Sequence, residues 1–287
     1  MSAHPGEPTA DDASAADVDD AGAADVDDAG AADLAGKVAL ITGGTAGVGL
    51  ETGLRLARRG ACVVVTGRSP EGGERALSVL RPVSRKTFAE AGDAGDPAAI
   101  TALVDRVVAA HGGIDILVSA GSPHDIGPTP FAEMTLEDLK RAFDSRIYPR
   151  IFPVRAALPA LRERGGSVVM LATDAGRHPT PGESVMGAVG AAVILMTKAL
   201  ARELSRWSIR VNSVAMTITS GTPSWDTIFA TESFQSKLFT KAVERFPQGR
   251  PPSAGEVADV AVFLAADAAQ VTGQTVSVNG GLSFGGW

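Results

Sequence analysis

Short apolar runs alternate with helix-length amphipathic segments from Lys37 to the end of the chain. This alternation predicts βαβ units, in which parallel strands are covered by helices on both faces. The predicted strands are Val38–Thr42, Cys62–Thr66, Lys86–Ala89, Ile116–Val118, Ser167–Ala172, Ile209–Ala215 and Thr275–Asn279. The predicted helices include Gly49–Arg58, Ala98–His111, Leu136–Arg164, Gly182–Arg206 and Ala254–Ala265. The pattern therefore predicts an α/β fold with one doubly wound parallel sheet, of the Rossmann type, in a single domain over residues 34–287.

One long interval, residues 216–250, contains no predicted strand. An interval of this length in a compact α/β domain is more often a lid or binding loop than a plain connection, so we expect an extended lid here. Two interpretations of its many aromatic residues stay open, because they can pack together within the lid or face a large, flat, apolar substrate. These residues are Trp225, Phe229, Phe234, Phe239 and Phe246.

The net charge of −7 over 287 residues is distributed unevenly. Residues 1–33 contain ten acidic residues and no Lys or Arg, which leaves 26 basic and 23 acidic residues in the rest of the chain. A repeated Ala-Ala-Asp-Val-Asp-Asp-Ala-Gly segment makes these first 33 residues a low-complexity acidic tail, which we expect to be disordered.

Composition also limits the partners and the location that we expect. No run of about 20 uninterrupted apolar residues indicates a membrane span, and the N-terminus lacks the pattern of a secretory signal. We expect a cytoplasmic protein with no membrane or nucleic-acid partner. The single cysteine, Cys62, cannot form an internal disulfide, and we expect no metal site.

A glycine-rich turn follows the first predicted strand and leads directly into a helix. Glycines at such a turn let the backbone approach a pyrophosphate, and the free N–H groups at the helix N-terminus attract its charge. The sequence therefore predicts dinucleotide binding by Gly43, Thr45, Ala46, Gly47, Val48 and Gly49.

The choice of dinucleotide depends on the end of the second strand. An acidic residue there would bind the ribose hydroxyls of NAD, and a basic residue would bind the additional phosphate of NADP. The sequence has Arg68 and Ser69 and no carboxylate, so we predict NADPH as the coenzyme. Because no second basic residue accompanies Arg68, some use of NADH stays open, and the alternative for Arg68 is a solvated surface residue.

The turn Thr-Gly-x-x-x-Gly-x-Gly resembles that of the short-chain dehydrogenase/reductase family. The resemblance extends over residues 34–287, through Asp93, Ile209-Arg210-Val211-Asn212 and the segment from Gly249 to Gly281. It implies a nicotinamide coenzyme, a substrate cleft at the carboxyl edge of the sheet, and a homodimer or homotetramer formed through the helices Leu136–Arg164 and Gly182–Arg206. The further coenzyme contacts that it implies are Asp93, Ala94, Ser119, Ala120, Gly121 and Thr219.

The catalytic residues of this family have no clear counterpart in the chain. The resemblance places the family's tyrosine at Met186, its lysine at Gly190, its serine at Thr173 and its asparagine at Arg146, and Tyr148 is the sole tyrosine. We take Thr173 as the candidate catalytic residue, with a strand-end turn as the alternative. His124, Asp125 and His178 follow strands at the cleft edge, where such residues are more often solvated than catalytic.

The resemblance implies an NADPH-dependent ketoreductase. Without the tyrosine and lysine, and with an aromatic-rich lid, the chain resembles atypical polyketide-pathway members of the family. We therefore expect a small-molecule aromatic polyketide as substrate, with the proton supplied by a phenolic hydroxyl beside its ketone. Two alternatives stay open, namely a catalytically silent NADP(H)-binding regulator or scaffold, and a cyclase or dehydratase on the same fold.

Overall fold

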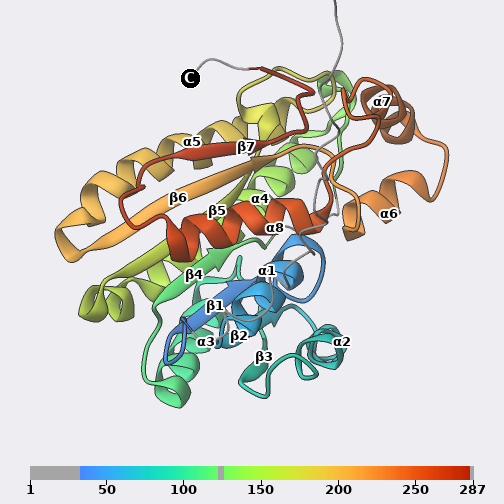
Figure 1. The fold of residues 1–287 in the computed structure, drawn as a ribbon. Coiled ribbons are helices and arrows are strands. Elements are labelled where there is room, and N and C mark those ends of the chain that lie inside the picture. Colours follow the sequence, from blue (N-terminus) through green and yellow to red (C-terminus); the bar gives the residue numbers. More distant parts are fainter. Residues whose placement is uncertain (1–32, 122–125, 285–287) are drawn as a thin grey trace, which may run out of the picture. The chain divides into compact units, whose positions relative to one another are not determined.

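A seven-stranded parallel sheet forms the centre of the computed structural model, which describes residues 33–121 and 126–284 (Figure 1). The strand order is β3-β2-β1-β4-β5-β6-β7. The register pairs Val38 with Cys62 on one side of β1 and Ala39 with Ile116 on the other. The strands are β1 (Val38–Thr42), β2 (Cys62–Gly67), β3 (Thr87–Ala91), β4 (Ile116–Ser119), β5 (Gly166–Thr173), β6 (Ile209–Met216) and β7 (Thr275–Val278).

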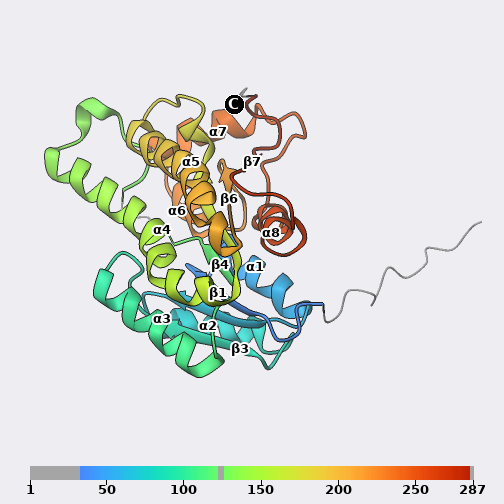
Figure 2. The same cartoon turned by 90° about the vertical axis from the view of Figure 1, so that its left-hand side faces the viewer.

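Helices cover both faces of this sheet (Figure 2). One face packs against α1 (Gly47–Arg58), α2 (Pro70–Leu80) and α8 (Ala254–Val262), and the other against α3 (Pro97–His111), α4 (Leu136–Arg164) and α5 (Ser184–Leu204). Two short helices, α6 (Pro223–Phe229) and α7 (Phe234–Val243), follow β6.

The two faces have separate apolar cores, which the alternation of side chains along β1 illustrates. Ala39 and Ile41 pack with α1 and α8, whereas Val38 and Leu40 pack with α3, α4 and α5. Because both faces of the sheet are covered, β1 is buried at every position and is a continuous apolar run rather than an alternating one. Each fully buried Leu or Ile side chain contributes roughly 1.5–3 kcal/mol to this packing.

Helix α4 contains three prolines, at positions 149, 153 and 159. A proline has no N–H, so Pro153 leaves the carbonyl of Pro149 without its helical donor. The hydroxyl of Ser119, at the end of β4, donates to this carbonyl at 3.3 Å and to that of Arg150 at 2.9 Å. The end of β4 is thereby joined to the middle of α4, beside the carboxyl edge of the sheet.

The predicted strands and their order along the chain are confirmed, and the fold class with them. Several predicted helix boundaries differ from the structure by one to three residues, and two of them have a clear physical reason. The helix predicted from Gly182 begins at Ser184, because Gly182 adopts φ 77° in a turn, and the helix predicted to end at Ala265 ends at Val262, where a π-helical turn to Asp267 follows. Of the predicted acidic tail, only Asp33 lies within the described residues; it accepts a hydrogen bond from Arg59 Nε at 3.0 Å.

The segment Ser184–Trp207 is long and apolar enough to cross a membrane by length and composition, with a mean hydropathy of 1.7. A core helix of a soluble protein meets the same criteria, so this observation is weak evidence for a span. One side of α5 is buried through Val185, Val189 and Val193, and its C-terminal half carries Lys198 and Arg202.

Candidate active site

A cavity of about 830 Å³ opens at the carboxyl edge of the sheet. The ends of β2, β5 and β6 contribute to its walls, together with the loops after β1, β3 and β4 and residues of α6 and α7. Its volume lies in the range of small-molecule and coenzyme sites. We call its two parts the glycine end, lined by Gly43, Gly47, Arg68 and Asp93, and the methionine end, lined by Arg146, Thr173, Glu183, Met186 and Phe239.

At several positions of the glycine end, only glycine can adopt the backbone conformation or fit the space available. Gly43 and Gly47 have φ angles of 68° and 52°, in the left-handed region that L side chains rarely adopt. A Cβ on Gly43 would lie 2.7 Å from the Cα of Gly121, and one on Gly49 would lie 2.3 Å from the carbonyl oxygen of Gly43. The glycines therefore permit a tight turn that brings the chain after β1 against the chain after β4.

The N-terminus of α1 faces this end of the cavity. Its N-cap residue, Ala46, has no side chain that can accept from the first-turn N–H groups, and no acidic residue lies in the first turn. Gly47, Val48 and Gly49 line the cavity. Unpaired N–H groups and the helix dipole attract a phosphate, so this geometry fits the pyrophosphate of a dinucleotide.

Arg68, at the end of β2, is exposed and lines the same end. Within the part of the chain that the structure describes, no carboxylate lies within 4.0 Å of its guanidinium group. A guanidinium without a carboxylate partner can form a forked, charge-assisted contact with a phosphate. Arg68 therefore fits the additional phosphate of NADPH.

Most of the remaining predicted coenzyme contacts also line the cavity. Asp93 accepts a hydrogen bond from the N–H of Gly95 at 2.8 Å, and Thr219 donates to the carbonyl of Thr217 at 2.8 Å. The structure brings together Gly43, Thr45, Ala46, Gly47, Val48, Gly49, Arg68, Asp93, Ala94, Ala120, Gly121 and Thr219. Their contacts with a coenzyme stay predictions that this arrangement supports.

Ser69 and Ser119 differ from the rest, because neither lines the cavity. Ser69 is the N-cap of α2, where its hydroxyl accepts from the N–H of Gly72 at 3.1 Å. Ser119 is fully buried and donates to the carbonyls in α4. Both hydroxyls stabilise neighbouring helices, so the structure does not place them as coenzyme contacts.

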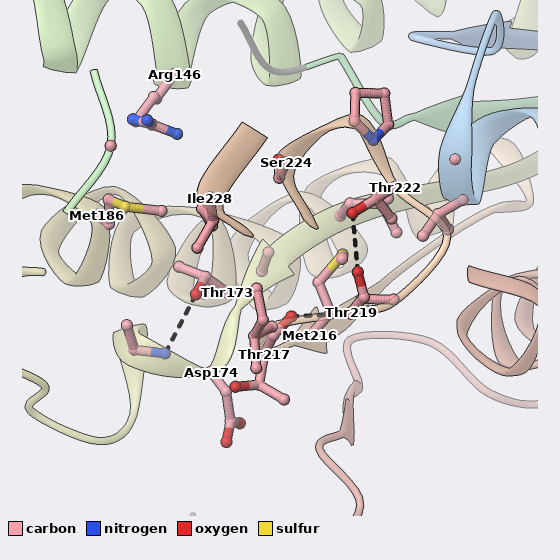
Figure 3. A pocket seen from close by; sticks show the side chains of 18 of the residues that line it. Arg146, Thr173, Asp174, Met186, Met216, Thr217, Thr219, Thr222, Ser224 and Ile228 are labelled. Carbon is pink, nitrogen blue, oxygen red and sulfur yellow. Dashed lines mark hydrogen bonds between the residues drawn. The ribbon is translucent and has the colours of Figure 1, made fainter. Parts of the chain in front are cut away.

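At the methionine end, Thr173, Met186, Arg146 and Ile228 surround the space above the end of β5 (Figure 3). Thr173 Oγ1 accepts from the N–H of Ala175 at 3.3 Å, which is the strand-end turn considered as its alternative role. Thr173 also lines the cavity, and its hydroxyl proton is not used in that bond. The structure therefore places Thr173 where it can contact a substrate while it also forms the turn.

Helix α5 lies unusually close to the end of β5. A Cβ on Gly190 would be 2.6 Å from Cγ2 of Thr173 and 3.0 Å from its carbonyl oxygen. A Cβ on Gly187 would be 2.7 Å from the carbonyl oxygen of Ala175. Gly190 is thus required by packing, and a lysine at this position would need α5 or β5 to move.

The aromatic residues of the 217–250 segment mostly pack with one another. Trp225 and Phe229 are in contact, with ring centroids 4.4 Å apart, and Phe239 and Phe246 belong to the same small apolar cluster as Ile218. Of the five aromatics, Phe239 lines the described cavity, together with Ile228 and Leu238. Packing within the segment therefore explains most of these rings, and one ring faces the methionine end.

The polar residues after β5 are largely engaged with the C-terminal part of the chain. The carboxylate of Asp174 accepts from Ser277 Oγ at 2.7 Å, from Asn279 Nδ2 at 2.9 Å and from Ser283 Oγ at 2.5 Å. His178 Nε2 lies 3.9 Å from this carboxylate. His124 and Asp125 lie outside the described residues.

Glu183 is a residue of the methionine end that the sequence analysis missed. It is 9% exposed, immediately precedes α5 and lines the cavity. Burial raises the pKa of its carboxyl group to about 7, although Thr180 and the charge of Arg146 oppose this effect. The sequence contains a sign of this residue, because Glu183 is an acidic residue at the start of an apolar helix, about one turn before Met186.

Two arginines of α4 also line this end. Arg146 is 6% exposed and donates to the carbonyl of Ile126. Arg150 donates to the carbonyl of Leu171 at 2.8 Å, and burial, with the nearby charge of Arg146, lowers its pKa to about 10. The guanidinium group of Arg150 is therefore charged at neutral pH. Among the described residues, no group of three His, Cys, Asp or Glu side chains is placed to hold a metal ion.

A parallel sheet in this order, with an anion-binding helix N-terminus at its carboxyl edge, defines a dinucleotide-binding oxidoreductase fold. Residues 43–283 match the family model described as enoyl-(acyl carrier protein) reductase. The chain is 33% identical over 252 residues to a 3-oxoacyl-[acyl-carrier-protein] reductase from Thermotoga maritima. This alignment covers 87% of this chain and 98% of that protein. It is 32% identical to human dehydrogenase/reductase SDR family member 4, over 86% of this chain and 88% of that protein.

A solved structure agrees with these relatives. The apo structure of a short-chain oxidoreductase from Pseudomonas aeruginosa PAO1, described as containing an atypical catalytic center, matches with a TM-score of 0.80 at 28% identity. It covers 88% of this chain and 100% of that chain. The chain therefore belongs to the short-chain dehydrogenase/reductase family, and it is an NAD(P)H-dependent oxidoreductase of the ketoreductase type.

Proposed function

We propose that this chain uses NADPH to reduce a ketone on a polycyclic aromatic polyketide of the angucyclinone type, in the cytosol, as a step of antibiotic biosynthesis. The observation that carries the proposal is the methionine end, where the apolar side chains of Met186, Ile228, Leu238 and Phe239 line the same cavity as Thr173. Such a lining suits a flat, apolar ring system. In its lack of a Tyr-x-x-x-Lys pair, the chain is similar to the atypical angucyclinone ketoreductase of simocyclinone biosynthesis.

The preference for NADPH over NADH rests on Arg68. Its guanidinium lines the glycine end without a carboxylate partner in the described chain, and no acidic residue at the end of β2 is available for ribose hydroxyls. When bound, NADPH supplies the hydride. The first turn of α1 and Arg68 would hold its phosphates, and the rest of the cavity lining would then orient the bound coenzyme relative to the substrate.

The proton needs a source other than a tyrosine, because the sole tyrosine, Tyr148, does not line the cavity. We propose that a phenolic hydroxyl beside the substrate ketone is hydrogen-bonded to the carbonyl oxygen and transfers its proton as the hydride arrives. A general acid contributes typically 10²–10⁴-fold, and correct positioning can contribute as much. The chain's own part is then to position the ketone and to exclude water.

The test is to follow loss of reduced-nicotinamide absorbance with three ketones. The first is an aromatic polyketide ketone with a neighbouring phenol, the second is its O-methyl ether, and the third is a 3-oxoacyl thioester. We expect reduction of the first and little reduction of the other two. Turnover of the thioester alone would reject the aromatic substrate, and conversion without NADPH oxidation would favour a cyclase or dehydratase.

We also propose that the protein is a homodimer or homotetramer formed through α4 and α5. The outward side of α5 carries Leu195, which is 69% exposed, flanked by Ala188, Ala191 and Ala192, whose small side chains permit close approach. Light scattering at micromolar concentration should give a multiple of the 29.3 kDa chain mass. Leu195→Glu should shift the mass toward the monomer, and a wild type that is monomeric would reject the proposal.

A further inference from the structure

The proposed reduction leaves a negative charge on the substrate, and none of its steps removes that charge. When the phenol gives its proton to the carbonyl oxygen, the substrate becomes a phenolate inside the cavity. A phenol has a pKa of about 10, so the phenolate would take a proton from any neutral carboxylic acid in contact with it. Protonation of this phenolate returns the substrate to its neutral form before the product leaves the cavity.

Glu183 lies where such an acid is needed. It lines the methionine end together with Met186, Arg146 and Thr180, and its side chain is almost fully buried. Among the described residues, the other two carboxylates that line the cavity are in different situations. Asp93 is at the glycine end, and Asp174 accepts hydrogen bonds from three side chains of the C-terminal segment.

We propose that Glu183 is the terminal proton donor of the reduction, which protonates the substrate phenolate after the phenol has protonated the carbonyl oxygen. This inference rests on the function proposed above. In the balanced step, hydride adds to the carbonyl carbon as the C=O π bond breaks, and the carbonyl oxygen takes the phenolic proton. The phenolate oxygen then takes the proton of Glu183, and the Glu183 carboxylate takes up a proton from bulk solvent, which is the one proton that the net reduction consumes. The ketone is reduced to the alcohol and the nicotinamide is oxidised.

The protonation state of Glu183 agrees with this role. Because burial raises its pKa to about 7, a large fraction of Glu183 is protonated at neutral pH, unlike an ordinary glutamate. Transfer from an acid of this pKa to a phenolate is favourable by roughly a thousandfold. The match between the pKa of the acid and the working pH is what general acid catalysis requires.

Charged groups from several elements line the same cavity as Glu183. Arg146 and Arg150 come from α4, His178 from the segment after β5, and Lys241 and Arg245 from α7 and the turn after it. Of these, Arg146 lowers the pKa of Glu183 through its charge. Its guanidinium would also stabilise the Glu183 carboxylate that remains after the transfer.

The experiment compares wild type with Glu183→Gln, which keeps the shape of the side chain and removes its proton. The matched control is Glu163→Gln, an exposed residue of the last turn of α4 that does not line the cavity. With the phenolic ketone and saturating NADPH, wild-type kcat should be constant below pH about 7 and fall above it. Glu183→Gln should lower kcat by about 10²-fold and remove this pH dependence, and Glu163→Gln should match wild type.

Two further measurements make the result independent of folding and of turnover. NADPH affinity, followed by coenzyme fluorescence, should be the same in all three proteins. In the coenzyme-free protein, a carboxyl ¹³C resonance that is missing from Glu183→Gln should titrate near pH 7. Titration of that resonance near pH 4.5 would overturn the proposal.

The outcomes separate this inference from the proposed function. If Glu183→Gln keeps the wild-type rate and pH profile while the O-methyl ether is not reduced, the phenol is the proton source and Glu183 is not the terminal donor. If the ether is reduced at an undiminished rate that still depends on Glu183, the relay through the phenol is wrong. If wild type reduces neither ketone, both the substrate and the role of Glu183 are overturned.

Discussion

Gly190 on α5 lies against Thr173 at the end of β5, so closely that a Cβ on the glycine would come within 2.6 Å of the threonine Cγ2. Glycine inside a helix costs about 1 kcal/mol of stability relative to alanine. The close contact with Thr173 explains why glycine is nevertheless present at position 190. The contact fixes the distance between α5, which carries Met186, and the strand that carries Thr173. Met186 and Thr173 line the same end of the cavity (Figure 3).

Gly190→Ala should therefore destabilise the protein by about 1–2 kcal/mol, because the cost of overpacking exceeds the gain in helix propensity. The control is Gly53→Ala on α1, where a Cβ would make only ordinary contacts at 3.4 Å and beyond, with no net destabilisation expected. Urea unfolding measures both. Equal stability of the two variants would show that α5 can move away from β5 without cost.

Arg68→Ala should weaken NADPH binding by roughly 10- to 100-fold and leave NADH binding nearly unchanged. A hydrogen-bonded contact with a charged group contributes about 1.5–3 kcal/mol, and only NADPH has the phosphate that Arg68 would bind. Arg75→Ala, an exposed arginine of α2 that does not line the cavity, is the control. Tighter binding of NADH than NADPH by wild type would contradict the coenzyme preference.

Thr173→Val should lower kcat by less than about tenfold. If the phenol and Glu183 supply the proton, the threonine hydroxyl assists only by contact with the carbonyl oxygen. Its bond from the N–H of Ala175 is also lost, at a cost of about 1 kcal/mol in stability. A loss of 10²–10³-fold in kcat without a change in NADPH affinity would instead identify Thr173 as an essential donor to the developing oxyanion.

Glu183 should make the protein less stable as the pH rises. Its folded pKa, about 7, lies above its ordinary value of 4.5, so the folded protein holds the proton more tightly than the unfolded chain. The contribution of this bound proton to the free energy of unfolding is fully present below pH about 4.5 and is lost as the pH rises through about 7. Integration gives roughly 3 kcal/mol between wild type and Glu183→Gln by pH about 9.

Denaturant unfolding of the coenzyme-free protein between pH about 5 and 9 measures this difference. Arg250 and the hydrogen bonds from Ser253 lower the pKa of Glu256 to about 2. The effect of Glu256 on stability therefore has the opposite pH dependence. Its contribution is lost only as the pH falls below about 4.5, outside this window. Parallel stability curves for wild type and Glu183→Gln would show that Glu183 titrates as an exposed glutamate does.

The sequence by itself determined the fold and the glycine end. Period and spacing are local properties, so alternating apolar runs predicted the seven strands, and the spacing of Gly43, Gly47 and Gly49 between a strand and a helix predicted an anion-binding turn. The position of Arg68 directly after the second strand was enough to bring it to the same edge, because carboxyl ends of parallel strands lie together.

The family resemblance had already placed Arg146, Thr173 and Met186 at catalytic positions, but which other side chains complete the methionine end was decided only by the tertiary structure. Whether an aromatic residue of the 217–250 segment faces the cavity depends on how α6 and α7 pack, and this packing directs Trp225 and Phe229 toward each other and Phe239 toward the cavity. Ser69 and Ser119 have suitable side chains for a coenzyme, but a helix N-terminus and a proline-freed carbonyl engage them. The pKa of Glu183 likewise depends on burial among residues distant in sequence, such as Arg146, and no local pattern encodes the desolvation that keeps its proton.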